Sequence, residues 1–416
     1  MSETVHIPQL RFPEFSGDWN RVKIQKLLDD KSIISHLDGN HGALYPRSEE
    51  FTKEGVPYVT ANDFINGKVD LKKCKCLPVE RASQFKKGIA HNGDVLFAHN
   101  ATVGPVALLE TDLEYVVLST TATYYRCDNN TLINKYLKVY LTSNDFVRQY
   151  SRVMSQSTRN QVPITTQRLF YINLPDKPEQ QKIAAFLTAV DSKIEQLSKK
   201  QELLGEYKKG LMQQIFSQAI RFKADDGSDF PDWEEKKLGD VAEIVGGGTP
   251  PTAVEKYWNG NIQWFTPTEI KSKFIVNSKR TITQVGLDTS SAKLLPKGTL
   301  LFSSRATVGE VGIAVQECTT NQGFQSFIVN KNNEPEFLYN WIIKNKKEFI
   351  RRASGSTFLE IGKSEIKKIK LHIPALPEQT KIANFLSSID SKIEQVGKQL
   401  DESKQFKKAL LQQMFI

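Results

Sequence analysis

Two segments of the chain repeat one pattern of hydrophobic and polar positions. Residues 178–216 and 377–415 align without a gap and are identical at 21 of 39 positions. In each copy apolar residues recur seven apart with others between them, the pattern of a helix with a single apolar face. These residues are Ile183, Leu187, Val190, Ile194, Leu197, Leu204 and Leu211 in the first copy, and Ile382, Leu386, Ile389, Ile393, Val396, Leu400 and Leu410 in the second. Each copy predicts one long amphipathic helix, and we expect the two apolar faces to bury against each other as an antiparallel coiled coil.

The repeat continues into the regions that precede the two helices. Trp19 returns as Trp233, and the Ala-Thr-Val-Gly turn at 101–104 returns at 306–309. Alternating apolar and polar residues between such islands predict strands. Away from the islands the two regions share little sequence. We therefore expect an α+β protein with a pseudo-two-fold internal repeat, in which two α/β domains are joined by the two helices.

The islands also set the expected domain boundaries. These are an N-terminal segment at 1–19, a first α/β domain at 20–172, a first helix at 176–217, a linker at 218–233, a second α/β domain at 234–372 and a second helix at 376–416. Because the helices stayed similar while the domains diverged, we expect the helices to hold two readers at a set distance, each reader with its own target.

Most of the net positive charge of the chain lies outside the two repeated segments. The chain of 416 residues has a formal charge of +9, and each repeated segment has six lysines against five acidic residues. The excess of positive charge therefore lies mainly in the dissimilar domains, which favours a polyanionic partner for them. No stretch approaches the roughly 20 apolar residues of a membrane span, and the N-terminus lacks the features of a signal peptide, so we expect a cytoplasmic protein.

Three patterns could belong to an enzyme, and each has a simpler explanation. The Pro-Asp-Trp-Glu-Glu-Lys run at 231–236 has the residue types of a nuclease site but not their usual spacing over two strands. The glycine run at 246–250 lacks the lysine of a phosphate-binding loop. The six histidines include no pair at the spacing of metal ligands on a helix. We therefore expect a chain without catalytic residues and without a metal site.

Two basic loops occupy equivalent places before the two helices, at 154–168 and 351–370. They mix Arg and Lys with Ser, Thr, Asn and Gln, residue types that contact phosphates and read base edges. The alternative is that each loop is only a solvated surface. The candidate DNA contacts are Thr158, Arg159, Asn160 and Gln161 in the first loop, and Arg351, Arg352, Thr357 and Lys363 in the second, where the two adjacent arginines are the expected phosphate contacts.

The repeated turns at 99–104 and 303–309 form a second candidate surface. Their polar residues could face DNA, or the turns could be required only by the fold. The candidates here are His99, Asn100, Ser303, Ser304 and Arg305.

The duplicated motif Pro-Glu-Gln-x-Lys-Ile-Ala-x-Phe-Leu followed by Asp-Ser-Lys-Ile-Glu-Gln resembles that of the DNA-specificity subunit of Type I restriction–modification enzymes. The resemblance covers essentially the whole chain. It implies that 20–172 and 234–372 are target recognition domains, each reading one half of a bipartite site in double-stranded DNA. It also implies that the helices dock two modification subunits and, through them, two restriction subunits. The assembled complex would methylate adenine at N6 or cleave DNA with ATP, with S-adenosylmethionine, ATP and Mg²⁺ bound by the partners and no cofactor in this chain.

Two readings from other classes stay open at this point. The chain could be a coiled-coil interaction protein with no role on DNA, although the positive charge of the domains speaks against it. It could also be an enzyme whose site has no recognisable motif, which hydrolysis or methyl transfer by the isolated chain would reveal.

Overall fold

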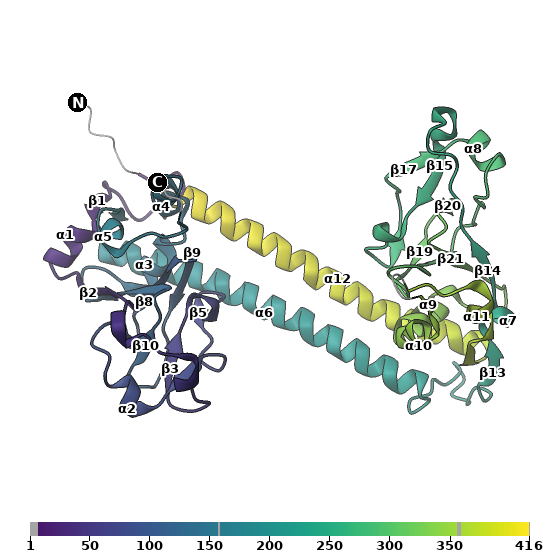
Figure 1. The fold of residues 1–416 in the computed structure, drawn as a ribbon, viewed down its shortest axis with the longest axis horizontal. Coiled ribbons are helices and arrows are strands. Elements are labelled where there is room, and N and C mark those ends of the chain that lie inside the picture. The colour runs from purple at the N-terminus through teal and green to yellow at the C-terminus, as the bar shows by residue number, and fades with distance from the viewer. Residues whose placement is uncertain (1–6, 157–158, 356–358, 416) are drawn as a thin grey trace. The chain divides into compact units, whose positions relative to one another are not determined.

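The computed structural model describes residues 7–156, 159–355 and 359–415. The chain divides into two compact units: unit 1 comprises Met1–Lys200 and Val396–Ile416, and unit 2 comprises Gln201–Gln395. The two long helices, α6 (Lys177–Phe216) and α12 (Leu376–Gln413), each pass from one unit into the other. Each unit therefore contains one α/β domain and one part of each long helix (Figure 1).

Unit 1 contains a six-stranded sheet of order β2-β11-β8-β9-β5-β4, a four-stranded sheet of order β6-β3-β10-β7, and the pair β1-β12. Neighbouring strands are antiparallel except β3 with β10 and β5 with β9. The strands are β1 (Asn20–Lys23), β2 (Ile33–Asp38), β3 (Val56–Val59), β4 (Phe64–Ile65), β5 (Lys68–Val69), β6 (Lys75–Leu77), β7 (Ile89–Ala90), β8 (Val95–Asn100), β9 (Thr102–Leu108), β10 (Val116–Leu118), β11 (Ala122–Cys127) and β12 (Tyr171–Leu174).

Three helices of unit 1 pack against one face of the six-stranded sheet. Residues from α3, α4 and α6 share one apolar core with β8, β9 and β11, because each element turns its buried face to the same interior. The helices are α1 (Ile24–Asp29), α2 (Val79–Ala82), α3 (Asn134–Tyr140), α4 (Asn144–Met154) and α5 (Ile164–Gln167).

Unit 2 repeats this plan with smaller sheets. Its sheets have the orders β14-β21-β18-β19-β16 and β17-β15-β20, and the pair β13-β22 corresponds to β1-β12. The strands are β13 (Glu234–Lys237), β14 (Ala242–Gly246), β15 (Trp258–Phe265), β16 (Phe274–Ile275), β17 (Arg280–Ile282), β18 (Leu300–Phe302), β19 (Val311–Ala314), β20 (Cys318–Thr320), β21 (Gln325–Val329) and β22 (Lys370–Ile373). The helices are α7 (Leu238–Val241), α8 (Gln284–Asp288), α9 (Pro335–Lys344), α10 (Lys346–Arg352) and α11 (Lys363–Lys368).

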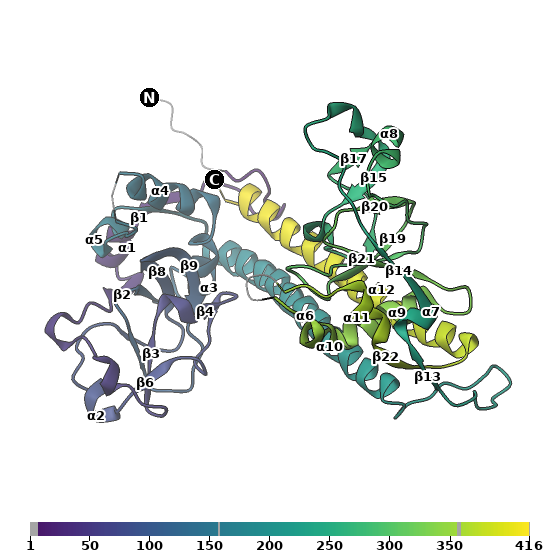
Figure 2. The same ribbon diagram turned by 45° about the vertical axis from the view of Figure 1, so that its right-hand side comes forward.

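In each unit the two helix segments run antiparallel. In unit 1, Leu187 shares the core with Leu410, and Asp191, one turn further along α6, pairs with Lys407, one turn back along α12. In unit 2 the same arrangement joins α6 and α12 through their other parts, where Lys208 pairs with Asp390. The antiparallel direction expected from the sequence is thus confirmed inside each unit (Figures 1 and 2).

Candidate nucleic-acid interface

Each α/β domain is anchored to the start of a long helix by a buried glutamate. In unit 1 the Arg11 guanidinium donates two hydrogen bonds to the Glu179 carboxylate, at 2.7 and 2.8 Å, and the Trp19 indole donates a third at 3.2 Å. The Glu179 carboxylate is 1% exposed, so it depends on these donors to replace water. The bond to Glu179 also raises the pKa of Arg11.

Unit 2 has the same anchor. The Arg221 guanidinium donates to the Glu378 carboxylate at 2.9 and 3.0 Å, and the Trp233 indole donates at 3.2 Å. In both units the main partners of the glutamate in the Pro-Glu-Gln motif are the arginine and tryptophan of the segment that precedes the domain, which is why these residues recur together.

The glutamine of the motif fixes the domain a second time. In unit 1 the Gln180 side chain accepts from the Ile133 amide and donates to the carbonyls of Thr131 and Pro175. In unit 2, Gln379 accepts from the Glu334 amide in the same way. The repeated motif therefore orients each domain on its helix through two successive side chains.

In unit 1 hydrogen bonds join the two candidate surfaces, the turn at 99–104 and the loop at 154–168. We call this arrangement the joint. The tip of the β8–β9 hairpin lies against the loop that follows α4, because the Ala101 amide donates to the Asn160 carbonyl at 3.0 Å and the Val162 amide donates to the His99 carbonyl at 2.8 Å. The Asn160 side chain also donates to the Ala101 carbonyl at 2.7 Å. The hairpin thus holds the first basic loop in a defined position.

Unit 2 forms the same joint with different side chains. The Ala306 amide donates to the Leu359 carbonyl at 3.0 Å, and the Ile361 amide donates to the Ser304 carbonyl at 2.9 Å. Both hairpin tips place an alanine in the left-handed region, with φ of 61° at Ala101 and at Ala306. A non-glycine residue adopts this conformation at a cost, and such positions are commonly held by their surroundings at functional sites.

A buried polar cluster holds the end of the first loop in unit 1. The Gln167 side-chain oxygen accepts from the Tyr125 hydroxyl at 2.6 Å and from the Thr123 hydroxyl at 3.1 Å, and it lies 3.2 Å from His36 Nε2. Its amide donates to the Val162 carbonyl at 2.9 Å, directly beside the joint. Burial lowers the pKa of His36 to about 3, so this imidazole is neutral at physiological pH.

The predicted DNA contacts differ in how they are presented. Arg159, Asn160, Arg305, Arg351 and Lys363 are exposed. Gln161, Asn100 and Arg352 are partly exposed.

Three of the predicted contacts are buried: His99, Ser303 and Ser304. In this structure they lie beneath the joint and offer no surface to DNA. Thr158 and Thr357 lie outside the described residues.

Three candidate arginines of unit 2 have carboxylate neighbours. The Arg305 guanidinium lies 3.4 Å from Glu360, and Arg351 and Arg352 both donate to Glu348 at 2.6 Å. These bonds lower the pKa of Glu348. Because exposed ion pairs contribute only about 0–1 kcal/mol, a DNA phosphate can replace the carboxylate at small cost. The first loop, by contrast, has no acidic residue between 154 and 168.

The sequence did not reveal the residues that build the joint. Gln167 was part of the first loop, but its burial could be seen only once β11 and α5 were placed together. Glu360 lies within the second loop, yet its approach to Arg305 depends on an isolated bridge between residues 55 positions apart. The useful signal was the matched position of turn and loop in the two repeats.

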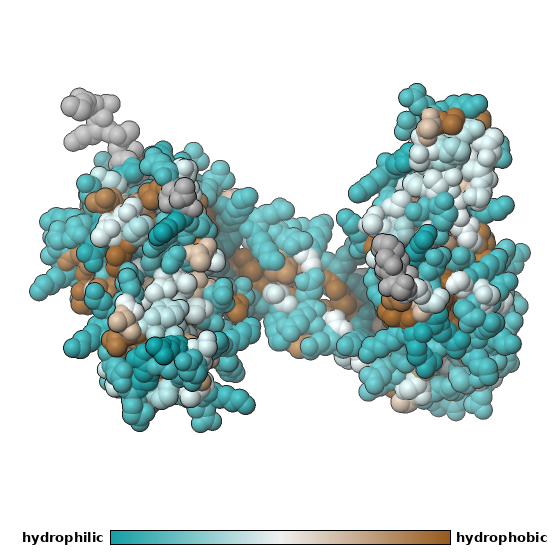
Figure 3. Space-filling view, viewed as in Figure 1, coloured by the Kyte–Doolittle hydropathy of each residue, from teal (hydrophilic) through white to brown (hydrophobic). Residues whose placement is uncertain are grey.

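Among the described residues, no helix is long and apolar enough to cross a membrane. No group of three or more His, Cys, Asp or Glu side chains there could hold a metal ion. In the face shown in Figure 3, each unit is mainly hydrophilic with scattered hydrophobic patches.

Comparison with known proteins identifies the class of this chain. The family model described as "Type I restriction modification DNA specificity domain" matches residues 34–204 and 231–402. The chain belongs to this family of DNA specificity subunits, whose members are not themselves catalytic. The resemblance inferred from the duplicated motif is therefore confirmed.

Individual relatives agree with this assignment. The chain is 39% identical over 191 residues to the MjaIX specificity subunit of Methanocaldococcus jannaschii, a match that spans 44% of each protein. It is 24% identical to the MjaVIII specificity subunit of the same organism over 97% of this chain and 92% of that protein. The crystal structure of the Type I S subunit from M. genitalium has the same fold, with a TM-score of 0.60 at 15% identity over 99% of both chains.

Proposed function

We propose that this specificity subunit reads a bipartite DNA site, one half with each unit, through the joint of hairpin tip and basic loop. The observation that carries the proposal is that both joints are closed by two equivalent amide-to-carbonyl bonds although the loops differ in sequence. A rigid support with variable side chains is what two readers of different half-sites require.

The side chains divide between two roles. Arg159, Asn160 and Gln161 serve the first half-site, and Arg305 and Lys363 serve the second. Arginine and the amide side chains can form paired hydrogen bonds with base edges in the major groove. Arg351 and Arg352, at the end of α10 where the second loop begins, contact phosphates. Thr158 and Thr357, in the same loops, are proposed as further contacts.

The test is to replace Arg159 and Arg305 by alanine, singly and together, in the full chain with its modification subunit. Each single change should weaken binding to the cognate site by about 1–3 kcal/mol and relax the sequence preference of one half-site only. Arg351→Ala should instead weaken binding to all sequences and reduce the salt dependence. Lys398→Ala removes one exposed cation from α12 and is the matched control. Unchanged affinity and an unchanged methylated motif in the double variant would remove the joints from the DNA site.

We further infer that two modification subunits dock on the long helices, with two restriction subunits bound through them. In the part of α6 within unit 2 Tyr207 is 56% exposed, and in the part of α12 within unit 1 its repeat equivalent Phe406 is 53% exposed. Exposed aromatic residues in equivalent places are typical of protein-binding positions. Replacing both by alanine should reduce co-purification of the modification subunit while binding of DNA is kept.

The remaining activities belong to those partners. The modification subunits would bind S-adenosylmethionine and methylate adenine at N6, and the restriction subunits would use ATP and Mg²⁺ to translocate and cleave DNA in the cytoplasm. The length of the helices would set the unspecified gap between the half-sites. A coiled-coil protein without a DNA role is disfavoured, because the matched family is one of DNA specificity domains.

A further inference from the structure

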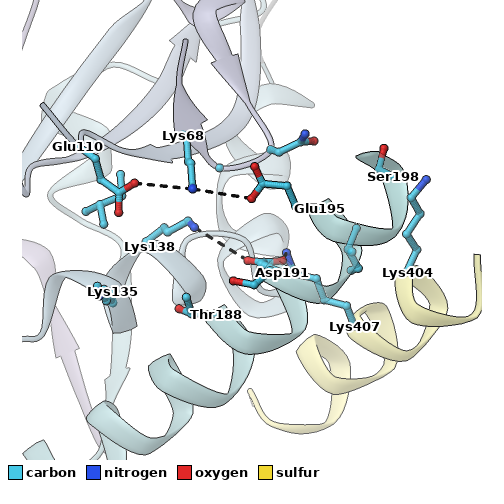
Figure 4. Close-up of a pocket in the computed structure, with 15 residues that line it drawn as sticks. Lys68, Glu110, Lys135, Lys138, Thr188, Asp191, Glu195, Ser198, Lys404 and Lys407 are labelled. Atoms are coloured by element: carbon cyan, nitrogen blue, oxygen red, sulfur yellow. Dashed lines mark ion pairs between the residues drawn. The ribbon is translucent and has the colours of Figure 1, made fainter. Parts of the chain in front are cut away.

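Unit 1 contains a pocket with a volume of about 350 Å³ that is lined by charged side chains and lies away from the joint. Figure 4 shows the pocket between the β4–β5 turn, α3 and the unit 1 parts of α6 and α12. Its walls carry three carboxylates, from Glu110, Asp191 and Glu195. They also carry five lysines: Lys68, Lys135, Lys138, Lys404 and Lys407. Cations from three different elements of the fold, β5, α3 and α12, therefore converge on one space.

The lysine at the back of the pocket is poorly paired. The Lys138 side chain is 14% exposed, and its Nζ lies 4.0 Å from the nearest carboxylate oxygen, that of Asp191. That carboxylate is already engaged by Lys407 at 2.5 Å. Burial lowers the pKa of Lys138, which is the expected response of an ammonium removed from water without a close counterion. A second anion close to the Lys138 ammonium would increase the stability of the folded protein.

The lysines nearer the mouth are also available. Lys68 lies 3.9 Å from Glu110 and 3.8 Å from Glu195, distances too long for hydrogen bonds. Lys135 and Lys404 are exposed, and among the described residues neither forms an ion pair. The pocket thus offers several ammonium groups whose hydrogen-bond donors are not used by carboxylates of the protein.

In unit 2 an inward-facing lysine is paired with carboxylates of the same unit. The Leu108 amide donates to the Gly67 carbonyl in unit 1, and the equivalent Ile313 amide donates to the Lys273 carbonyl in unit 2. Lys273 therefore stands where unit 1 has a glycine. Its ammonium reaches inward to Glu336 at 2.7 Å and to Asp390, the repeat equivalent of Asp191, at 3.2 Å.

The comparison shows what the missing side chain does in unit 1. A carbon placed on Gly67 would lie 2.9 Å from Cε of Lys138, so the glycine leaves the space into which Lys138 extends. In unit 2 the inward lysine has two close carboxylates, one of which also pairs with Lys208, whereas in unit 1 the inward lysine has one carboxylate 4.0 Å away that also pairs with Lys407. The inward lysine of unit 1 therefore lacks the close carboxylate that Glu336 provides to the inward lysine of unit 2.

We propose that this pocket binds a small phosphate-bearing molecule, whose phosphate oxygens accept hydrogen bonds from Lys135, Lys138 and Lys404. The volume lies within the range of small-molecule sites and exceeds what a phosphate group alone requires. Because its ligands come from α3 and from α12, occupancy would strengthen the attachment of the α/β domain of unit 1 to α12. The site is separate from the proposed DNA contacts and does not depend on them.

The experiment measures thermal unfolding of the full chain in inorganic phosphate and in chloride at equal ionic strength, with ³¹P NMR to detect binding. Phosphate should raise the unfolding midpoint above that in chloride. Lys135→Gln with Lys404→Gln, two exposed changes that leave the core intact, should weaken the phosphate affinity roughly tenfold, as loss of charge-assisted bonds does. Lys138→Met should abolish the phosphate effect even if it alters basal stability.

A matched control separates this pocket from the basic loop. Arg351→Gln with Arg352→Gln removes the same amount of charge from unit 2 and should leave the phosphate effect unchanged. The proposal is overturned if phosphate stabilises no more than chloride, or if the Lys135 and Lys404 variant keeps the full effect. It is also overturned if the arginine variant loses the effect, because phosphate would then bind at the loop.

Discussion

In unit 1, α5 ends in Gln167, whereas the repeat-equivalent residue of α11 in unit 2 is Ile366. Strand register extends the comparison, since Tyr125 pairs with His36 on β2, and Phe327 in the equivalent place pairs with Ile244 on β14. Unit 1 therefore builds this part of its core from hydrogen-bonded polar side chains, and unit 2 builds it from apolar ones. Both cores support the same joint of hairpin tip and loop.

The difference shows which parts of the repeat are constrained. The anchors at Glu179 and Glu378 keep the same three donors with nearly the same distances. The support of the loop, by contrast, has changed its chemistry completely. Attachment to the helices is thus held fixed, while the interior beneath each reading surface is free to change with the surface it carries.

Removing either anchoring glutamate should cause the largest loss of stability, and the loss should be equal in the two units. Glu378→Ala leaves the Arg221 guanidinium and the Trp233 indole without their acceptor, and we expect a loss of about 3–5 kcal/mol from unit 2. Glu179→Ala should cost unit 1 a similar amount. The measurement is hydrogen exchange resolved by unit, with Glu402→Ala on the exposed face of α12 as a control that should stay near the parent. A much smaller loss in one unit would mean that the anchors are not equivalent.

The polar cluster should give the next largest effect, confined to unit 1. Gln167→Ile removes the acceptor of the Tyr125 hydroxyl, whereas the Thr123 hydroxyl keeps the Phe97 carbonyl as an acceptor. A buried donor left without a partner should cost about 1–3 kcal/mol. Adding His36→Ile and Tyr125→Phe copies the core of unit 2 and should recover part of this loss, since an apolar replacement of a whole buried network is often well tolerated. Urea unfolding of the single and triple variants tests this. A triple variant less stable than the single one would refute the equivalence of the two cores.

Acid should lower the stability of unit 1 through its buried histidines, by less than the substitutions above. The pKa of His36 is about 3 in the fold against an ordinary value of 6.5, so the unfolded chain binds a proton first as the pH falls. Stability contributed by the neutral imidazole is complete above pH 6.5 and is lost progressively between pH 6.5 and pH 3, with at most about 2 kcal/mol lost by pH 5.

Burial shifts the pKa of His41 and His99 in the same direction. Unit 2 provides the internal control, because its single histidine, His372, is exposed on β22. Hydrogen exchange at pH 7.5 and 5.5, corrected for intrinsic rates, should show a larger loss of protection in unit 1. An equal loss in both units would show that buried histidines do not control the acid response.

The sequence predicted the repeated elements well because their signals are local or periodic. A seven-residue apolar repeat fixes the face of a helix, and α6, expected at 176–217, runs from Lys177 to Phe216. The antiparallel direction followed from the duplication. The matched turns and loops correctly indicated equivalent places in the two domains.

The burial and the partners of the site residues could not be predicted from the sequence because they depend on long-range contacts. His99, Ser303 and Ser304 are polar residues in a turn, and nothing local distinguishes a side chain that faces solvent from one covered by a loop about 60 residues away. The role of Glu179 was also hidden, since its arginine partner lies 168 positions earlier. Burial and partner choice became visible only when strands and helices were placed together.

The central claim is that each unit reads its own half-site and that the helices determine only the gap between them. The most direct measurement exchanges residues 20–172 for the corresponding domain of another specificity subunit, expresses the chimera with its modification subunit, and sequences the methylated DNA motif. The account predicts that one half-site changes while the other half-site and the gap stay the same. A change in both half-sites, or a changed gap with both half-sites preserved, would contradict it.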